Sequence, residues 1–339
     1  MPTPAQTAPE TNSSAPDAAE RSSSEPESRP SCPAPADIRA EVAAYDREAD
    51  VGTWDGPRYR ITYRVLGQGP PLILCPGIAS TYRGFAIMLN RLASRFKTVV
   101  YDYPGEHQGD GAKLDKLTHD NYVDDVLGLI DHLQFGRAFL VGLSFGSTVV
   151  LKALEREPRR FPKAVIQGAF ARREFTGAER GALWVGRRFP GRVASLPLHG
   201  PILSWNNKYH FPDVISDRWQ HFVEQNGLTP IAGLSRRLDL LSHLDLRPSL
   251  GHISTEILVL HGNEDRLVPR KYFEELTVGL KNSRGVLMPL VGHQPHYTHP
   301  EGLAQAILDY CLPCNPEGCP NETAVSESTK NVSTVAEDG

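Results

Sequence analysis

Short apolar runs and helix-like repeats alternate along most of this chain. Runs that are apolar, or that alternate between apolar and polar residues, are typical of strands and occur at 59–66, 72–75, 98–101, 164–166, 256–260 and 285–288, and in the run that ends at Leu143. Between them, apolar residues recur every three or four positions, as at Val123, Val126 and Ile130. Strands that alternate with helices in this way predict an α/β fold with a mostly parallel central sheet flanked by helices.

The pattern of apolar and polar residues changes between residues 170 and 248. Strand-like runs vanish there, and short helical pieces are interrupted at Pro190, Gly191, Pro197, Gly200, Pro201 and Pro212. We interpret 170–248 as a helical cap inserted over the carboxyl edge of the sheet, where α/β proteins place their ligands. The core is then formed by 37–169 and 249–312.

Both ends of the chain differ from this core. Residues 1–36 are rich in Ser and Pro, and 313–339 are polar and of low complexity. Segments with so little to bury do not offset the entropy lost on folding. We therefore predict disordered tails at both ends.

Composition excludes several classes of protein. The 339 residues carry a formal net charge of -4, which gives no indication of nucleic-acid binding. No apolar run approaches the ~18 to 20 residues that cross a bilayer, and the chain does not start like a secretory signal. The five cysteines are an odd number in a long chain, so a disulfide scaffold is not expected: Cys32, Cys75, Cys311, Cys314 and Cys319. We expect a cytoplasmic protein without stable membrane insertion, and the sequence leaves the oligomeric state and the role of the C-terminal cysteines open.

A Gly-x-Ser-x-Gly motif follows the apolar run that ends at Leu143. Its serine, Ser144, lies between that run and a helical pattern from Thr148 to Leu154. A strand, a sharp turn and a helix in this order form a nucleophile elbow, which exposes the serine hydroxyl at the turn. Gly142 and Gly146 lack the Cβ atoms that would clash where strand and helix come close.

Two later strands end in residues that would activate this serine. A serine hydroxyl needs a base, which is usually a histidine oriented by a carboxylate. Asp265 lies in the loop after 256–260, and His293 lies in the loop after 285–288. Ser144, Asp265 and His293 therefore leave the same edge of the predicted sheet, in the order serine, acid, histidine.

Other residues compete for these roles. Glu264, Asp239 and Asp245 are alternative acids, and His296 and His299 are alternative bases. Ser144 itself has the alternative of an ordinary turn serine. A cysteine that ends an apolar run, such as Cys75, is more often a small buried hydrophobic residue than a nucleophile.

These motifs resemble those of the α/β-hydrolase fold family, in its cap-bearing serine hydrolase form similar to esterases and lipases. The resemblance covers about residues 50 to 312 and rests on the motifs at 75–78, 142–146, 261–265 and 292–293. It implies that Ser144 is the nucleophile, His293 the general base and Asp265 the orienting acid. It also implies an oxyanion hole formed by the backbone N–H groups of Ile78 and Phe145.

The chain departs from the family pattern at two places. Many members have His-Gly at the turn after the first buried strand, whereas this chain has Pro76-Gly77. The loop that starts at Asp102 lacks the arginine that often follows in the family. Both departures bear on the shape of the pocket more than on the chemistry.

The cap is expected to set the substrate. Between Phe170 and Arg247 we count eleven Lys and Arg against seven Asp and Glu, which indicates either a solvated basic face or an anionic substrate. Gly77 and the aromatic residues Trp184, Trp205 and Trp219 are candidates for substrate binding, although the tryptophans also suit a role in fixing the cap to the sheet.

The function we expect is hydrolysis of a carboxylic ester, or of a related acyl bond, in a small-molecule substrate. The reaction passes through an acyl-enzyme and requires no metal or organic cofactor. The alternatives are a ligand receptor on the same fold with slow or absent turnover, and an acyltransferase or perhydrolase that replaces water with another acceptor.

Overall fold

A single eight-stranded sheet organises the structure, a computed structural model that describes residues 35–107, 109–186 and 190–312. The strands follow the order β1-β2-β4-β3-β5-β6-β7-β8 across the sheet. Their bounds are β1 Asp50–Asp55, β2 Arg60–Leu66, β3 Pro71–Cys75, β4 Lys97–Tyr101, β5 Phe139–Leu143, β6 Lys163–Gln167, β7 Glu256–Gly262 and β8 Ser283–Met288. β1 and β2 are antiparallel to their neighbours, and all pairs from β4 to β8 are parallel. The mostly parallel sheet expected from the alternating pattern is confirmed.

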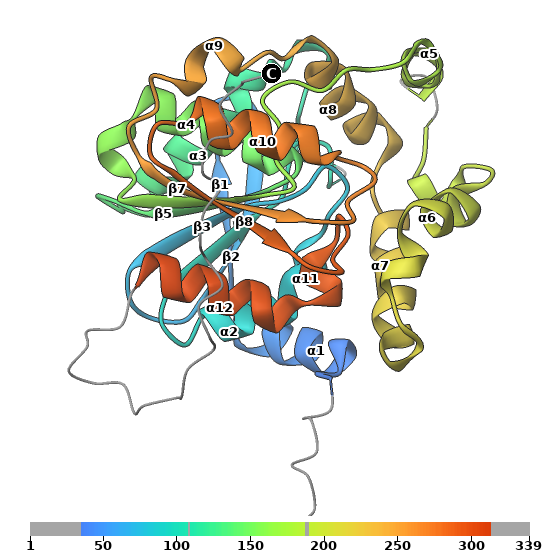
Figure 1. The fold of residues 1–339 in the computed structure, drawn as a ribbon, viewed down its shortest axis with the longest axis horizontal. Helices are drawn as coiled ribbons and strands as arrows, with labels where there is room; N and C mark the ends of the chain where they lie inside the picture. Colours follow the sequence, from blue (N-terminus) through green and yellow to red (C-terminus); the bar gives the residue numbers. More distant parts are fainter. Residues whose placement is uncertain (1–34, 108, 187–189, 313–339) are drawn as a thin grey trace, which may run out of the picture. The chain divides into compact units, whose positions relative to one another are not determined.

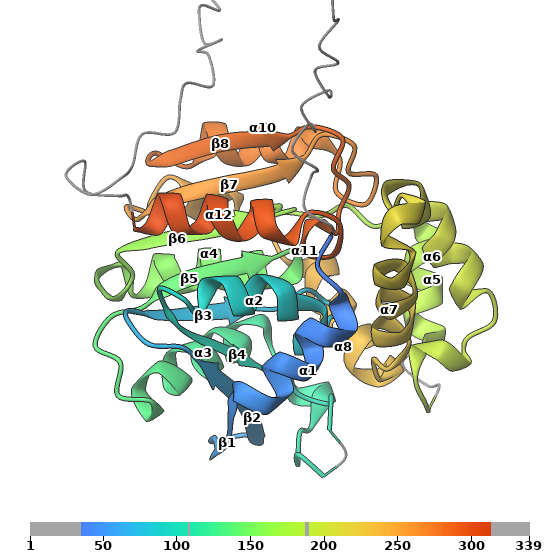
Figure 2. The same ribbon diagram turned by 90° about the horizontal axis from the view of Figure 1, so that it is seen from below.

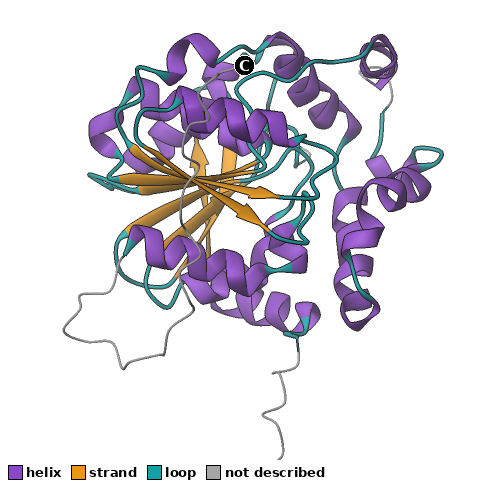
Figure 3. Ribbon diagram, in the orientation of Figure 1, coloured by secondary structure: helices purple, strands orange, loops and turns teal. Residues whose placement is uncertain are grey.

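Helices cover both faces of the sheet (Figures 1 and 3). One face carries α1 Ile38–Glu48, α2 Ala86–Leu92 and α12 Pro300–Cys311, and the other carries α3 His119–His132, α4 Phe145–Arg156 and α10 Arg270–Gly279. Each face has its own core, with Leu74 and Val141 facing the first group and Ile73 and Leu140 facing the second. The alternation of side chains along each strand therefore feeds two apolar layers, as the near-continuous apolar runs of a doubly covered parallel sheet require.

Helices also make up the segment between β6 and β7. They are α5 Gly177–Gly186, α6 His199–Asn207, α7 Ser216–Gly227, α8 Ile231–His243 and the short α9 Arg247–Leu250. We call residues 170–248 the cap. Figures 1 and 2 both place α5, α6 and α7 beyond the carboxyl ends of the strands. No helix within the described ranges is long and apolar enough to span a membrane.

A buried arginine fastens the cap to the core. Arg218 on α7 donates to the backbone oxygens of Ala36 and Tyr297, at 3.0 and 3.2 Å, and pairs with Glu301 of α12. Tyr297 belongs to α11 Pro295–Thr298, directly after the loop that holds His293. One side chain thus connects the start of the described chain, the cap and the segment that follows the loop after β8.

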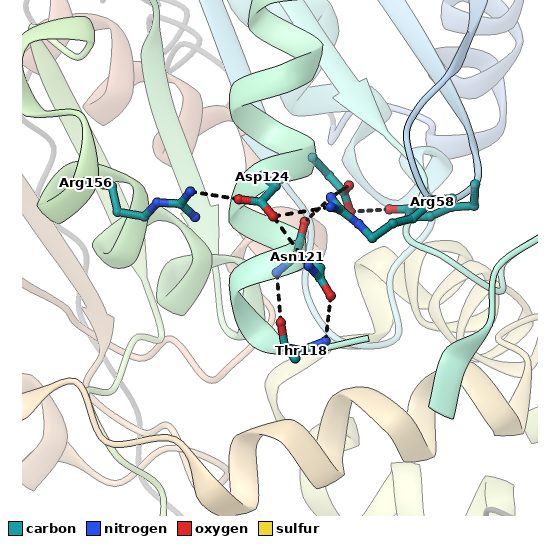
Figure 4. A network of polar contacts seen from close by, with 7 residues as sticks. Arg58, Thr118, Asn121, Asp124 and Arg156 are labelled. Carbon is teal, nitrogen blue, oxygen red and sulfur yellow. Dashed lines mark hydrogen bonds and ion pairs between the residues drawn. The ribbon is translucent and has the colours of Figure 1, made fainter. Parts of the chain in front are cut away.

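A network of polar contacts ties the β1–β2 hairpin to α3 and α4 (Figure 4). Arg58, in the turn before β2, donates to Asp124 at 3.3 Å and to Asp125 at 2.6 Å. Arg156 of α4 donates to the other oxygen of Asp124 at 2.8 Å. Thr118 and Asn121 form a reciprocal capping box at the start of α3. The helix that precedes β5 is therefore held in place at its first two turns.

Some element ends differ from the sequence expectation. A glycine after a helical repeat favours a helix end, so the sequence predicts that the helix before β5 ends at Gly136. In the structure α3 ends at His132, and the left-handed residue is Gln134, with φ 56°. The chain turns two residues earlier because Leu133 and Phe135 both pack against the core. Neither α1 nor β1 was predicted from the sequence. Residues 1–34 and 313–339, which include most of the two predicted tails and Cys314 and Cys319, lie outside the described residues.

Candidate active site

Ser144 occupies a strained turn between β5 and α4. Its backbone has φ 51° and ψ −113°, a region that non-glycine residues rarely adopt. A Cβ on Gly142 would lie 2.7 Å from the oxygen of Gly146, and a Cβ on Gly146 would lie 2.0 Å from the oxygen of Cys75. The two glycines therefore allow a strand-to-helix turn that holds Ser144 at its apex.

His293 and Asp265 complete a hydrogen-bonded chain with this serine. The Nε2 atom of His293 lies 3.0 Å from Ser144 Oγ, and its Nδ1 atom lies 2.6 Å from Asp265 Oδ2. Asp265 follows β7 and His293 follows β8, so three loops at one edge of the sheet supply the three side chains. The structure thus brings together the three residues singled out in the sequence.

The competing acids and bases lie elsewhere. Asp239 pairs with Arg236, and Asp245 pairs with Arg247, both within the cap. The carboxylate of Glu264 faces His210 at 3.7 Å. These positions leave Asp265 as the carboxylate that contacts His293.

The alternative histidines and the cysteine are also accounted for. His296 is buried with its ring 4.7 Å from that of Phe85, and the Nδ1 atom of His299 lies 2.9 Å from the Thr298 hydroxyl. Burial raises the pKa of Cys75 to about 12, so this thiol stays protonated and unreactive at neutral pH.

The environment of Asp265 keeps it ionised. Burial acts to raise its pKa, but the charge and hydrogen bond of His293 and the backbone N–H of Val268 outweigh burial and lower the pKa below its usual value. Its Oδ1 atom accepts from the N–H groups of Leu267 and Val268, each at 2.9 Å. An anionic Asp265 holds Nδ1 of His293 protonated and leaves Nε2 free to accept the serine proton.

Backbone donors for a developing oxyanion are available beside Ser144. Phe145 is the first residue of α4, so its N–H has no partner within the helix. Ile78 lies in the turn after β3, and its N–H donates to no backbone acceptor among the described residues. The 2.0 Å approach at Gly146 places the start of α4 directly against this turn. The turn that holds Ile78 and the start of α4 at Phe145 therefore lie close together.

An arginine from the cap reaches the turn that holds Ile78. Arg237 of α8 is fully buried; its Nε atom donates to the oxygen of Ile78 at 2.9 Å and its guanidinium pairs with Glu106 at 2.5 Å. Glu106 belongs to the loop after Tyr101, where the sequence lacks the family's arginine. Burial raises the pKa of Glu106 and the charge of Arg237 opposes that rise. The loop thus has an arginine partner after all, supplied by the cap.

Two further residues shape the site without a signal in the sequence. Gly168, at the end of β6 with φ 57°, lies against His293, and a Cβ there would be 2.9 Å from the imidazole Cε1. His210 of the cap contacts the residues directly before Asp265 and His293. Its Nε2 atom lies 3.2 Å from the oxygen of Glu264, and its ring fills the space next to Gly292. Only the fold reveals these contacts, because both residues are distant in sequence from the groups they touch.

A cavity of about 410 Å³ opens onto Ser144 and His293. Its walls come from the core and the cap and are mostly apolar: Ile78, Leu143, Phe170, Phe175, Leu183, Leu196, Leu203, Phe222, Ile231, Leu238 and Val268. Gly77 lines it, as expected. The charged pair Arg173 and Glu179 lies at its wall, joined by a 2.7 Å contact.

Two of the three tryptophans expected to line this cavity, Trp205 and Trp219, are not among the described residues that form its walls. Trp205 lies on the outer face of α6 and is 79% exposed, because the inner face of that helix is taken by Leu203 and Asn207. Trp219 packs against Phe211 and Phe222, so it fixes α7 within the cap. The side chain of Trp184 lies outside what the structure describes.

No cluster of three or more metal-ligating side chains occurs in the described ranges. A hydroxyl, a base that can take its proton, and two N–H groups beside it suit nucleophilic attack on a carbonyl carbon.

Comparison with known proteins adds a family context. A family model described as alpha/beta hydrolase fold matches residues 70–300. The chain is 26% identical over 259 residues to the AB hydrolase superfamily protein YisY of Bacillus subtilis, which covers 72% of this chain and 92% of that protein. It is 24% identical over 287 residues to 2-(acetamidomethylene)succinate hydrolase of Mesorhizobium japonicum, which covers 81% of this chain and 99% of that protein. Among solved structures, the enol-lactonase of Burkholderia xenovorans LB400 is similar in fold, with a TM-score of 0.68 and 20% identity over 77% of this chain and 99% of that one.

Proposed function

The chain belongs to the α/β hydrolase fold family, and from this premise we propose that it is a serine hydrolase that cleaves a carboxylic ester through an acyl-enzyme. The observation that carries the proposal is the hydrogen-bonded chain from Ser144 through His293 to Asp265, at 3.0 and 2.6 Å. Ordinary turn serines have no such base at hydrogen-bond distance.

Acylation begins when Ser144 Oγ attacks the carbonyl carbon of the ester. His293 Nε2 takes the hydroxyl proton as the new C–O bond forms, and the carbonyl oxygen becomes an oxyanion. When the tetrahedral intermediate collapses, the bond to the leaving alkoxide breaks and His293 returns the proton to it. Cleavage of an ester requires only one general acid, because a single histidine can protonate the leaving alkoxide.

Deacylation repeats these steps with water. His293 removes a proton from the water molecule as its oxygen attacks the acyl carbon, and then gives the proton back to Ser144 Oγ. Asp265 keeps the same tautomer of the imidazole in both half-reactions and stabilises the imidazolium that forms in each.

The oxyanion in both half-reactions is assigned to the N–H groups of Phe145 and Ile78. Donors fixed before the reaction need no reorganisation as charge develops, and removal of one such donor typically costs about 3 to 4 kcal/mol. The contact from Arg237 to the oxygen of Ile78 supports this assignment, because it holds the peptide turn in place from the other side.

The cavity favours an uncharged, apolar acyl group. Its volume of about 410 Å³ lies at the lower end of the range for small-molecule sites. The charged side chains Arg173 and Glu179 at its wall neutralise each other, so a substrate carboxylate would have to displace an existing ion pair. We also propose a reducing, cytoplasmic setting, which fits the buried free thiols of Cys75 and Cys311.

Labelling with a fluorophosphonate probe tests the nucleophile. We expect the wild-type chain to be labelled, Ser144→Ala to be unlabelled, and Ser195→Ala, a change at an exposed cap serine, to be labelled like wild type. Turnover of nitrophenyl esters of rising acyl length then measures hydrolysis and the depth of the cavity. Labelling of Ser144→Ala would refute the assigned nucleophile. Labelling without turnover would favour a receptor, and faster turnover with an added alcohol or peroxide would favour another acceptor.

A further inference from the structure

The cap contains a stretch without charged residues that is bounded by a cation at each end. No Asp, Glu, Lys or Arg occurs in residues 193–207, which lie between Arg192 and Lys208. Three large apolar side chains of this stretch are exposed: Leu198 by 67%, Ile202 by 56% and Trp205 by 79%. Apolar residues exposed singly are common on protein surfaces, but three on one short segment are not.

Two of these side chains, Ile202 and Trp205, share one face of α6, because they are three positions apart, the spacing of neighbours along one side of a helix. Leu198 is the N-cap residue of this helix and extends the exposed apolar stripe at its start. We call this stripe the outer face of α6. Figures 1 and 2 place α6 on the side of the molecule away from the sheet.

The opposite side of the same helix lines the substrate cavity. Leu203 and Asn207 lie among the cavity residues, and Leu203 packs on the cluster that contains Phe222 and Tyr297. A helix that is apolar on both sides normally lies buried between two apolar environments. Here only the inner environment is supplied by the described chain.

The ends of the stretch indicate what covers the outer face. Arg192 is exposed and donates to the backbone oxygen of Leu228, and Lys208 lies over the ring of Trp219. Neither pairs with a carboxylate within the described part of the chain. An apolar stripe with an exposed tryptophan and uncompensated cations at both ends matches the interface of a bilayer with anionic headgroups.

We propose that the outer face of α6 binds the surface of a lipid bilayer that carries anionic headgroups. Leu198, Ile202 and Trp205 enter the boundary between headgroups and acyl chains, while Arg192 and Lys208 contact the headgroups. The identity of the substrate rests on the proposed ester hydrolysis: it is then an apolar ester dissolved in the bilayer, which enters a cavity that lies one helix away. The helix is about 10 Å thick, so the distance to the cavity is short.

A second copy of the chain fits this face less well. A stable interface buries about 800 Å² on each partner, more than three side chains provide. If two copies of α6 packed face to face around a twofold axis, the ends that meet would both be cationic, whether the helices ran parallel or antiparallel. Like charges in contact oppose such a pair.

Vesicle co-sedimentation of the full chain tests this proposal. We expect binding to vesicles of phosphatidylcholine with phosphatidylglycerol, and weaker binding to phosphatidylcholine alone. Replacing two of the three apolar side chains, in the double variant Ile202→Ser with Trp205→Ser, should reduce the binding constant at least about tenfold. Lys208→Gln should reduce it about fivefold. The matched control is Val278→Ser, which removes a side chain that is 87% exposed on α10, and it should bind as wild type does.

Each other outcome overturns the proposal. Equal binding by wild type and the double variant, or equal binding to both kinds of vesicle, refutes an anionic bilayer as the partner of this face. A dimer in sedimentation equilibrium without lipid that the double variant abolishes assigns the face to a second copy instead. Thermal unfolding of the double variant checks that its fold persists.

The test is separate from that of the catalytic proposal. Ser144→Ala should bind vesicles as wild type does, because binding does not use the nucleophile. Vesicle binding without ester turnover would leave the surface assigned and refute hydrolysis. Turnover of soluble esters without vesicle binding would support hydrolysis and refute the bilayer as the partner of this face.

Discussion

Asp265 divides its two carboxylate oxygens between two tasks. Oδ1 accepts from two backbone N–H groups of its own loop, and Oδ2 accepts from His293. The first contact fixes the plane of the carboxylate, and the second transmits that orientation to the imidazole. An amide in place of the carboxylate would keep the shape but present an N–H or a weaker acceptor to one of these partners.

Asp265→Asn should therefore lower kcat by about four orders of magnitude, because an asparagine no longer selects the tautomer of His293 that accepts the serine proton. Turnover of a nitrophenyl ester measures this. Glu264→Gln is the matched control at the adjacent position, and near-normal turnover is expected because Glu264 faces His210. A large loss in the control with normal turnover in Asp265→Asn would reassign the acid.

At the scale of single residues, the sequence predicted the groups that follow strand ends. Ser144, Asp265 and His293 each lie directly after an apolar run, so their shared edge follows from topology alone. Gly168 and Arg237 could not be found in this way. The first acts by leaving room for an imidazole 125 positions away, and the second comes from a cap whose packing no periodicity describes.

At the scale of elements, α8 is joined to the oxyanion turn by one buried side chain. Arg237 is fully buried, and its contacts with Ile78 and Glu106 span two loops of the core. Removal of one partner of a buried ion pair costs about 3 to 5 kcal/mol, since the other charge is left unpaired. We therefore expect this junction to influence both the stability of the protein and the position of the Ile78 N–H, a proposed oxyanion donor.

Arg237→Met should lower the free energy of unfolding by about 3 to 5 kcal/mol in denaturant titrations. It should also lower kcat about tenfold or more, because the turn at Ile78 loses its donor. The double variant Arg237→Met with Glu106→Gln should be more stable than Arg237→Met alone, but its kcat should be as low as that of Arg237→Met. Arg236→Met, on the same helix, should leave kcat unchanged. If Arg236→Met and Arg237→Met reduce kcat equally, the effect belongs to α8 and not to the Ile78 contact.

The network in Figure 4 offers a second test at this scale. Asp125 is buried and receives hydrogen bonds from Arg58 and from the hydroxyl of Tyr59. Arg58→Ala removes one of these donors and should lower the free energy of unfolding by about 2 kcal/mol or more, measured in urea. Arg60→Ala is the control: its pair with Asp55 is exposed to solvent, so a much smaller change than that of Arg58→Ala is expected. Equal losses would show that burial of Asp125 does not govern the effect.

The sequence predicted the existence of the buried elements better than their ends. Central strands such as β3 and β5 are buried on both faces, so their apolar runs are unmistakable. β1 is an edge strand whose residues are largely exposed, and α1 has only Ile38 and Tyr45 buried, so neither leaves a strong pattern. Gly136 appeared to be the end of α3, but packing of Leu133 and Phe135 outweighed the preference of glycine for the left-handed turn.

At the scale of the whole molecule, several buried histidines are held neutral. Burial lowers the pKa of His296 to about 3 and that of His119 to about 4. Unfolded histidines titrate near ~6.5, so below that pH the unfolded chain binds protons that the folded chain does not. Stability should therefore fall as pH decreases from about 6.5, until the folded pKa values are reached.

His296→Phe should reduce this pH dependence. Between pH 7.5 and pH 5, protonation of His296 in the unfolded chain lowers the free energy of unfolding by about 2 kcal/mol, because ~1.5 pH units lie between the unfolded pKa and pH 5. Denaturant titrations at both pH values should show the loss of stability shrink by that amount in the variant. His243→Gln, a change at an exposed histidine, should leave the pH dependence as in wild type. An unchanged pH dependence in His296→Phe would mean that His296 is charged in the folded protein.

The pairing of β6 with β7 has a consequence for how this protein is made. The two strands are neighbours along five positions, yet the whole cap is synthesised between them. At about 5 to 20 residues per second, a ribosome needs roughly 5 to 20 s to add the intervening ~90 residues. During that time β6 presents an open hydrogen-bonding edge, which is a template for aggregation. Asp265 and His293 also follow the cap, so under the proposed mechanism the nascent chain carries Ser144 without its base and cannot act on esters before β7, β8 and the loops after them have been made.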